Sequence, residues 1–467
     1  MNTAIQGSEH KITDRIQQRL TNYAWDMNYD ALPREAIHAA KVRIIDTLGA
    51  LIGGFYGEPC RIARAIAAQV PDPDGATVLG TRIKTAPDMC AFVNATTARY
   101  AEVNDIYRLP GANFAGHPSD VITPVLAVAE HTRASGREFI TNVVLAYEVT
   151  CRICDVFNNR GFDNTNFCCL AIAVAAGRMY GLAPAQLSHC ISMAVVPNGI
   201  LKQVRTAPLS MWKAVGAGQA GKAGVFAAIL ARAGMEGPHL PFEGKAGWCK
   251  YIANQDFTMD TMGGDGTRFR ILDTVLRHRA APRNTISAIL AAEKIARVKN
   301  EHVKHVTVEV YQRAKERAGT GEERWNPDSR ETADHSIPYL VAATLLDGGV
   351  SPNTFSDAHL WNAELRALMQ KVEIIENKEF TQAYAGVPRE HRARITLVTS
   401  AGEQRVGEAG GDDNDLAEQM SDTQVAEKFR GLTEDYLGPR RVDAILDGLW
   451  HLDQLSDVAG IPSTFIL

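Results

Sequence analysis

The sequence predicts a mostly α protein with an α+β domain: an all-helical domain built from the N- and C-terminal parts of the chain, with the smaller α+β domain inserted between them. Helical periodicity runs through residues 11–272 and returns over residues 412–462, whereas residues 273–411 mix strand-like and helical patterns. The chain has 467 residues, which is enough for two or three domains with substantial cores. We therefore expect domain limits at 11–272, 273–411 and 412–462.

The composition is that of a soluble globular protein, with 45% hydrophobic and 22% charged residues. A net charge of −5 argues against nucleic-acid and anionic-membrane partners. Arg178 and Lys222 interrupt the longest apolar runs, so we expect no membrane span, and no signal peptide is visible. Most of the eight cysteines lie among apolar and alanine residues, as small buried hydrophobes do. These features favour a cytoplasmic, reducing location.

The first part of the helical domain divides into several predicted helices. Residues 36–52 repeat apolar side chains with a period of 3.6. A proline opens residues 87–100, at a position that a helix start tolerates. The proline- and glycine-rich residues 71–75 predict a turn, followed by a short strand. The remaining helical segments are residues 121–131, 139–157, 170–180 and 185–196.

The inserted part combines strands with short helices. Residues 303–311 alternate, with Val306, Val308 and Val310 on one face. Two further strands are predicted at residues 372–376 and 393–400, the second turning into a run that starts at residue 404. Helices are predicted at residues 284–298, 335–347 and 360–370 in the insertion, and at 421–430 and 439–451 in the C-terminal return.

A glycine- and alanine-rich helix over residues 214–233 follows Lys213 and the preceding Arg205. Glycine in a helix interior costs about 0.5–1 kcal/mol relative to alanine, so several glycines indicate close backbone packing or a helix N-terminus that faces a ligand. Free N–H groups and the helix dipole favour an anion there, and Lys213 adds a full positive charge. The alternative is a buried, closely packed helix whose lysine merely extends to water.

The loop between two of the predicted helices carries an acid and an imidazole, Asp105 and His117. This pair suits general acid–base chemistry because histidine titrates near neutrality. His117 precedes a proline, which favours extended backbone. The alternative is a solvated loop in which Ser119 or Asp120 caps the helix that begins near Val121.

A second charge-dense segment runs into an apolar helix. Asp334 is adjacent to His335 and can set its orientation, although Thr332 or Asp334 can equally be a helix N-cap. Arg277 and Arg279 add two cations next to the expected domain limit.

Other motifs do not indicate a metal or an organic cofactor. Cys151 and Cys154 lie inside a regular helical pattern, and a redox or metal role requires more ligands. His302 and His305 open a strand without a third ligand in the local sequence. The sequence contains no phosphate-binding glycine motif after a strand.

Six segments together resemble the MmgE/PrpD family, which includes 2-methylcitrate dehydratases, cis-aconitate decarboxylases and iminodisuccinate epimerases. The resemblance extends from about residue 31 to 451, and residues 330–339 are the most specific part. The segments are Ile44-Ile-Asp-Thr-Leu-Gly, Asn104-Asp105, Gly116-His-Pro-Ser-Asp, Ser210-Met-Trp-Lys-Ala, Gly234-Met-Glu-Gly-Pro and Arg330-Glu-Thr-Ala-Asp-His-Ser-Ile-Pro-Tyr.

The resemblance implies a helical domain with a smaller α+β domain, a homodimer, and an active site in the cleft between the domains. It also implies chemistry on a small polycarboxylate without metal or cofactor. The expected catalytic residues are Asp105, His117 and Lys213, and the expected substrate-binding residues are Arg205, Arg277, Arg279, Asp334, His335 and Tyr339.

Two positions depart from the family pattern. Many relatives have a lysine near the domain junction, where this chain has Arg277 and Arg279. Arginine keeps the charge and grips a carboxylate with two hydrogen bonds, but it does not readily exchange protons. Some relatives have a histidine where this chain reads Arg160-Gly-Phe-Asp163. Both changes bear on the choice of substrate.

The favoured function is a cofactor-independent carbon–oxygen lyase that dehydrates a 2-methylcitrate-like hydroxy-polycarboxylate. Decarboxylation of a cis-aconitate-like acid and epimerisation of an imino- or amino-diacid begin with the same carbanion and are the alternatives. An iron–sulfur hydratase needs three suitably placed cysteines, whereas Cys151 and Cys154 supply two. A protein that binds polycarboxylates without turnover is a further alternative.

Overall fold

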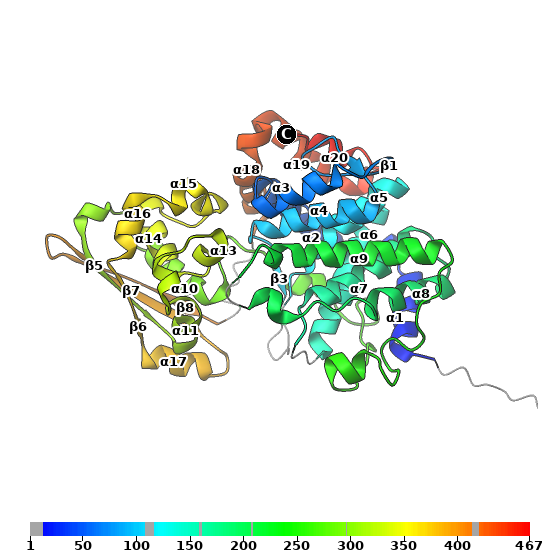
Figure 1. Cartoon of the computed structure of the whole chain (residues 1–467), viewed down its shortest axis with the longest axis horizontal. Coiled ribbons are helices and arrows are strands. Elements are labelled where there is room, and N and C mark those ends of the chain that lie inside the picture. Colours follow the sequence, from blue (N-terminus) through cyan, green and yellow to red (C-terminus); the bar gives the residue numbers. More distant parts are fainter. Residues whose placement is uncertain (1–12, 108–115, 158–160, 207–208, 296, 413–419) are drawn as a thin grey trace, which may run out of the picture.

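The computed structural model describes residues 13–107, 116–157, 161–206, 209–295, 297–412 and 420–467. The protein is mostly helical with a small mixed sheet, which confirms the predicted fold class. Figure 1 shows the helical body beside a smaller unit that holds the four-stranded sheet and its own helices.

The helical body is formed first by α1 to α9. Their bounds are α1 Arg15–Asp26, α2 Arg34–Gly53, α3 Glu58–Ala67, α4 Pro87–Tyr100, α5 Ile122–Thr132, α6 Gly136–Val156, α7 Thr165–Met179, α8 Pro184–Val195 and α9 Trp212–Arg232. Two pairs of short strands accompany them, β1 Pro71–Thr77 with β2 Lys84–Thr85, and β3 Ile106–Tyr107 with β4 Thr274–Val275. The predicted turn at residues 71–75 is therefore wrong, because these residues already belong to β1.

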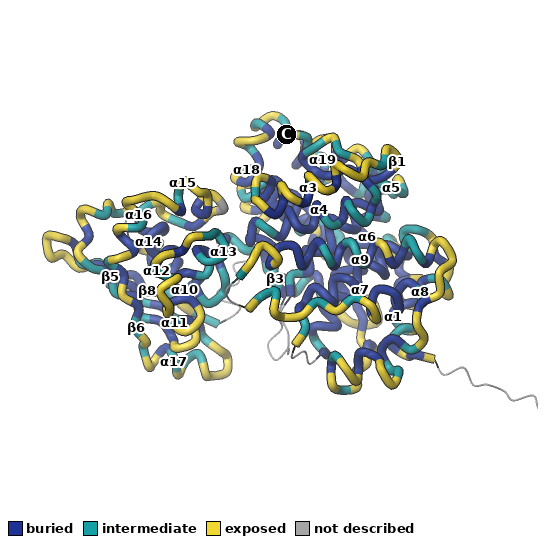
Figure 2. The backbone as a smooth tube through the Cα atoms, in the orientation of Figure 1, coloured by how far each residue is buried: buried dark blue, intermediate teal, exposed yellow. Residues whose placement is uncertain are grey.

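Helix α9 lies in the middle of the body, between α4 and α7 (Figure 1). Its glycines permit this contact: a Cβ atom at Gly218 would lie 2.1 Å from Thr96 Oγ1 of α4, and one at Gly224 would lie 2.7 Å from the carbonyl oxygen of Cys169 in α7. The run of small residues thus serves close helix packing. Figure 2 shows the buried interior that α4, α7 and α9 form.

Helix α9 also corrects the expectation that no apolar run is long enough for a membrane span. Among the described residues it is the one helix that meets this test by length and composition, with a mean hydropathy of 1.3 over its most apolar window. Lys222 does not lower the value enough, because alanine, valine, phenylalanine, isoleucine and leucine make up most of the rest of the helix. Since 67% of that window is buried inside the fold, the packing of α9 is that of a core helix.

The prediction of helix almost throughout residues 11–272 is wrong for residues 233–269. This stretch holds only the short π-turn Cys249–Ala253, and prolines and glycines interrupt it repeatedly. It is held in place by carboxylates from the helices. Asp14 accepts hydrogen bonds from the N–H groups of Phe242 and Glu243, and the fully buried Glu148 accepts one from that of Gly263.

The smaller unit has a four-stranded sheet in the order β6-β5-β7-β8, in which β5 runs parallel to β6 and antiparallel to β7. The predicted alternation is confirmed, since Val306, Val308 and Val310 are all buried. The strands are β5 Val303–Val310, β6 Val372–Glu376, β7 His391–Thr399 and β8 Gln404–Gly411. The helices are α10 Arg283–Glu293, α11 Gln312–Ala318, α12 Glu322–Trp325, α13 Arg330–Ala333, α14 Ile337–Asp347, α15 Asp357–Leu360, α16 Ala363–Met369 and α17 Lys378–Ala385.

The chain then returns to the helical body through α18 (Asp422–Leu437) and α19 (Pro439–Trp450), and ends with the short α20 (Ile461–Thr464). Helix α18 packs on α2. Two main hydrophobic cores result, one in the body and one around the sheet, and the second also takes in Ala50, Ala101, Val103 and Leu432 of the body. The limits 11–272, 273–411 and 412–462 remain our proposal for the domains, and this division of the core supports them.

Candidate active site

A buried ion cluster joins the two units at the first turn of α9. Lys213 Nζ lies 3.1 Å from Glu102 Oε1 and 3.0 Å from Asp334 Oδ2. Glu102 follows α4, and Asp334 directly follows α13. Lys213 is only 7% exposed, so the alternative of a lysine extending to water is wrong.

Glu102 is central to this cluster and is absent from the residues that the sequence indicated. Its backbone is left-handed, with φ of 58°, which is uncommon for a residue with a side chain. Its Oε2 lies 3.2 Å from Arg99 Nη1 and 3.4 Å from Arg277 Nη1. Burial alone would raise the pKa of Glu102, but Arg99, Lys213 and Arg277 together hold this pKa well below its usual value. Glu102 is therefore a carboxylate surrounded by cations.

His117 contacts the cluster through Arg277. Its Nδ1 is 2.8 Å from the carbonyl oxygen of Asp105, which can only accept, so Nδ1 carries the hydrogen and Nε2 keeps the lone pair. Arg277 Nη2 lies 3.4 Å from each ring nitrogen. Burial, followed by the charges of Arg99 and Arg277, places the pKa of His117 well below its usual value. The imidazole is thus neutral at neutral pH and can accept a proton at Nε2.

Asp105 anchors the backbone beneath His117. Its carboxylate accepts hydrogen bonds from the N–H group of Ser119 at 3.0 Å and from the hydroxyl of Tyr147 at 3.0 Å, and it is fully buried. The alternative of a loop in which Ser119 or Asp120 caps the following helix is wrong. The 3-10 turn Pro118–Val121 precedes α5, neither has a side-chain cap bond, and Asp105 accepts the hydrogen bond from the Ser119 N–H group. The backbone carbonyl of Asp105 thus contacts the imidazole, whereas its carboxylate contacts Ser119 and Tyr147.

Asp120 is a second buried acid near the cluster. Its Oδ1 lies 3.8 Å from Arg99 Nε, and burial raises its pKa to about 7. This carboxyl group therefore retains a proton over much of the range below neutrality. Asp120 is the last residue of the Gly116-His-Pro-Ser-Asp segment, but no sequence pattern indicated that its side chain is buried.

The other predicted binding residues fall into two groups. His335 Nδ1 contacts Asp334 Oδ1, which brings the imidazole to the Lys213 cluster. Although burial alone would raise the pKa of Asp334, Lys213 and His335 hold it below its usual value. Arg205 pairs with the buried Asp163 at 2.6 Å, and its charge also lowers the pKa of His117.

Arg279 and Tyr339 point elsewhere. Arg279 forms a two-point ion pair with Glu293 of α10, at 2.7 and 2.6 Å. The fully buried Tyr339 donates its hydroxyl hydrogen to the carbonyl oxygen of Thr354 at 2.5 Å. The structure thus brings Arg277, and not Arg279, to His117.

Both parts of the chain match models of a known family. Residues 18–260 match the MmgE/PrpD N-terminal domain, and residues 280–452 match the MmgE/PrpD C-terminal domain. The chain belongs to the MmgE/PrpD family.

Named relatives of this MmgE/PrpD chain are enzymes. It is 26% identical over 410 residues to a mitochondrial 2-methylcitrate dehydratase of Yarrowia lipolytica, covering 83% of this chain and 77% of the relative. It is 24% identical over 381 residues to the 2-methylcitrate dehydratase of Salmonella typhi, covering 77% of each chain. It is 25% identical over 379 residues to human cis-aconitate decarboxylase, covering 73% of each. The chain is an enzyme of the MmgE/PrpD type.

The cysteines of this MmgE/PrpD chain are thiols in the core. Cys151 and Cys154 are fully buried, and burial raises the pKa of both side chains, so they stay protonated near neutrality. Among the residues that the structure describes, no group of three or more His, Cys, Asp or Glu side chains is placed to hold a metal ion.

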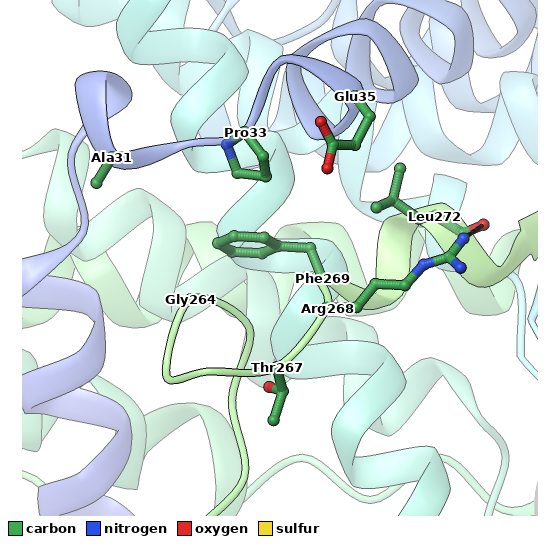
Figure 3. A pocket seen from close by; sticks show the side chains of 8 residues that line it. All are labelled: Ala31, Pro33, Glu35, Gly264, Thr267, Arg268, Phe269 and Leu272. Atoms are coloured by element: carbon green, nitrogen blue, oxygen red, sulfur yellow. Dashed lines mark hydrogen bonds between the residues drawn. The ribbon is translucent and has the colours of Figure 1, made fainter.

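Three cavities in the described part of the chain are not lined by Lys213, Glu102 or Asp334, although one of about 440 Å³ is lined by Val204 and Trp212, the neighbours of Arg205 and Lys213. One of about 490 Å³ lies in the helical body, where the Phe269 ring lies below Pro33 (Figure 3). A smaller one of about 60 Å³ includes Arg277 and continues along α10. Arg160, one of the departures from the family pattern, lies outside the described residues.

Proposed function

We propose that this MmgE/PrpD enzyme is a cofactor-independent lyase that dehydrates a 2-methylcitrate-like hydroxy-polycarboxylate by removing a proton next to a carboxylate. One observation carries the proposal: a neutral imidazole, His117, lies beside the cation Arg277 in a buried cluster that also contains Lys213. Such a site has both a base and fixed positive charge. The names of the dehydratase relatives support the substrate class.

Fixed cations stabilise the charge that develops in this reaction. Loss of a proton next to a carboxylate gives an enolate-like transition state with additional negative charge, and preorganised donors in a buried site stabilise it strongly. We assign this role to Lys213 and Arg277, with Arg205 as a further carboxylate-binding cation. Glu102 neutralises part of their charge in the free enzyme, so substrate carboxylates compete with it for Lys213 and Arg277.

His117 transfers the proton. Its Nε2 accepts the proton from carbon, while the Nδ1–H bond to the Asp105 carbonyl fixes the ring. The imidazolium that forms is then an acid for the leaving hydroxyl or the carbanion. Asp334 and His335 complete the cluster on the side of the α+β domain.

A second candidate function is decarboxylation of a cis-aconitate-like acid, which the human relative favours by name. It generates a carbanion that the same cations stabilise. Because His117 is neutral in the free enzyme, the proton that takes the place of the lost carboxyl group comes from water, directly or through the imidazole. Epimerisation of an imino- or amino-diacid and polycarboxylate binding without turnover are the remaining alternatives.

Proton exchange in deuterated buffer tests the proposal. The purified, metal-free enzyme is incubated with 2-methylcitrate, citrate, cis-aconitate and iminodisuccinate, and each acid is followed by NMR. We expect loss of water from the hydroxy acid. Release of carbon dioxide supports the decarboxylase instead, and exchange at a stereocentre without elimination supports the epimerase. If none of the four acids reacts, this result contradicts the proposed substrate class.

We further propose a cytoplasmic homodimer that has neither nucleic-acid nor membrane partners. The net charge of −5 supports the absence of a nucleic-acid partner. Sedimentation equilibrium tests the dimer, and a monomer at micromolar concentration contradicts it.

A further inference from the structure

Helix α18, the first helix of the C-terminal return, reaches the segment that carries Glu102 and Asp105. Lys428 Nζ donates a hydrogen bond to the carbonyl oxygen of Val103 at 2.8 Å and lies 2.5 Å from Asp46 Oδ1. Both side chains of this ion pair are nearly inaccessible to solvent, at 10% and 1% exposure. This buried ion pair therefore contacts the backbone of the segment that carries Glu102 and Asp105.

Val103 is one of three successive residues that are held in the same way. Each carbonyl oxygen of residues 101–103 accepts a hydrogen bond from a cationic side chain that comes from another part of the chain. The contacts are Arg330 Nη2 to Ala101 at 2.9 Å, Arg277 Nη1 to Glu102 at 3.2 Å and Lys428 Nζ to Val103 at 2.8 Å. Left-handed backbone at a residue such as Glu102 persists only where its surroundings hold it, and these three bonds do so.

Two glycines of helix α2 allow Lys428 to reach Asp46 and the Val103 carbonyl. Asp46, Gly49 and Gly53 lie on one face of α2, since they are three and four residues apart. A Cβ atom at Gly49 would lie 3.0 Å from the Phe429 ring, and one at Gly53 would lie 2.9 Å from Leu432. The two glycines therefore allow α18 to approach until Lys428 reaches Asp46.

We propose that Lys428, paired with Asp46, is a positioning residue of the active site. Its hydrogen bond to the Val103 carbonyl fixes the backbone of this segment. The fixed backbone keeps the Glu102 carboxylate against Lys213 and the Asp105 carbonyl against His117 Nδ1. The inference rests on the proposed function only in that it treats His117 as the base. It also gives a role to Asp46, the acid of the Ile44-Ile-Asp-Thr-Leu-Gly segment.

The test uses the double variant Asp46→Asn/Lys428→Met. Lys428→Met alone would leave a buried carboxylate without its partner and destabilise the fold. The double variant removes both charges and keeps the volumes similar. The control is Lys371→Met: Lys371 is half-buried in the α+β domain and donates to the carbonyl oxygens of Asn300 and Val303, both at 2.7 Å.

Two readouts are compared at equal folded fractions. The first is kcat and KM on the acid that the wild type turns over. The second is the NMR titration of the His117 ring, assigned by its absence in His117→Gln. In the double variant we expect kcat to fall about tenfold or more with little change in KM, because misplacement of a base by an ångström has effects of this order. We also expect the His117 titration to move toward that of an ordinary histidine, whereas Lys371→Met changes neither.

A folded double variant that retains the wild-type kcat and the wild-type His117 titration overturns the proposal. If the wild type turns over none of the tested acids, the proposed function fails, but the titration still decides the role of Lys428. The two failures are therefore distinguishable.

Discussion

At the scale of single residues, the active-site cluster consists of charges that are costly to bury alone. Lys213 contacts two carboxylates, those of Glu102 and Asp334, and Arg99 and Arg277 complete the charge balance of Glu102. Removing one member of a buried ionic group leaves its partners uncompensated, which is more destabilising than exchanging the whole group for apolar residues. Single substitutions in the cluster therefore affect both stability and chemistry, and each needs a control for folding.

Lys213→Ala is expected to lower kcat/KM by about 100-fold or more, because it removes a cation that stabilises the developing enolate. Steady-state kinetics measure the loss, and circular dichroism checks the fold. Lys222→Ala, on the same helix beyond the first turn, is the control and is expected to stay close to the wild type. A well-folded, active Lys213→Ala enzyme would contradict the assigned role.

The pH dependence of kcat/KM is expected to report His117 in the free enzyme. The base must be neutral, so activity falls when the pH drops through its pKa. Burial and the nearby arginines lower this pKa, which places the acidic limb below about 6.5, the ordinary value for histidine. A pH–rate profile from 4.5 to 8 measures the limb. A midpoint at or above 6.5 that is absent in His117→Gln would show that the environment does not depress the titration.

Sequence reasoning named several residues that the structure places together, among them Lys213, Asp334, Asp105 and His117. Their polar character in a loop, at a helix start or in a charge-dense segment was the first signal, and the resemblance to the family implied that they belong to one site. Glu102 could not be found in this way, since its role depends on a left-handed backbone and on cations from distant segments. The sequence also could not show whether Arg277 or Arg279 contacts His117, because this depends on the backbone course of the loop at the domain junction.

At the scale of elements, the glycines of α9 differ in what surrounds them. Gly224→Ala would place Cβ 2.7 Å from a carbonyl oxygen of α7 and 2.9 Å from Ile172, so the helices must separate. We expect a loss of about 1–3 kcal/mol of unfolding free energy, as for other overpacked cores. Chemical denaturation measures it.

Gly216→Ala is the matched control on the same helix. Among the described residues its nearest neighbour would be Thr165 Oγ1 at 3.8 Å, an ordinary contact. Helix propensity alone then predicts a gain of up to about 1 kcal/mol. Equal effects of the two substitutions would mean that close packing does not explain the glycines.

Periodicity located most helices and the four strands of the sheet, because many of them bury one face and expose the other. The same reasoning failed for residues 233–269, where backbone N–H groups are held by Asp14 and Glu148 and not by a helix. Contacts between residues more than a hundred positions apart leave no local pattern. Proline and glycine frequency was the available signal for the irregular course.

At the scale of the whole molecule, Arg330 links the α+β unit to the helical body. It donates to the Ala101 carbonyl at 2.9 Å and lies over the rings of Tyr100 and Phe355, at 4.3 and 5.4 Å from their centres. Composition and periodicity indicated the fold class, but not how the two units face each other. That arrangement depends on side chains such as this one.

Arg330→Ala is expected to loosen this junction and to lower kcat/KM roughly tenfold, since the catalytic groups come from both units. Hydrogen exchange should increase on both sides, around residues 101 and 334. Arg366→Ala is the control: Arg366 lies over the Trp361 ring and donates to the Pro327 carbonyl within the α+β unit. Increased exchange confined to the α+β unit in both variants would argue against a linking role for Arg330.

The contact between α18 and α2 also has a consequence for biosynthesis. A ribosome makes Glu102, His117, Lys213 and Asp334 long before it makes Lys428. The last of the three hydrogen bonds to the carbonyls of residues 101–103, the one to Val103, therefore forms only after Lys428 has been made. A nascent chain that stalls before α18 has emerged therefore carries every reacting group without the last support of the segment that aligns them. We therefore expect activity to appear only after α18 has been synthesised and has packed on α2.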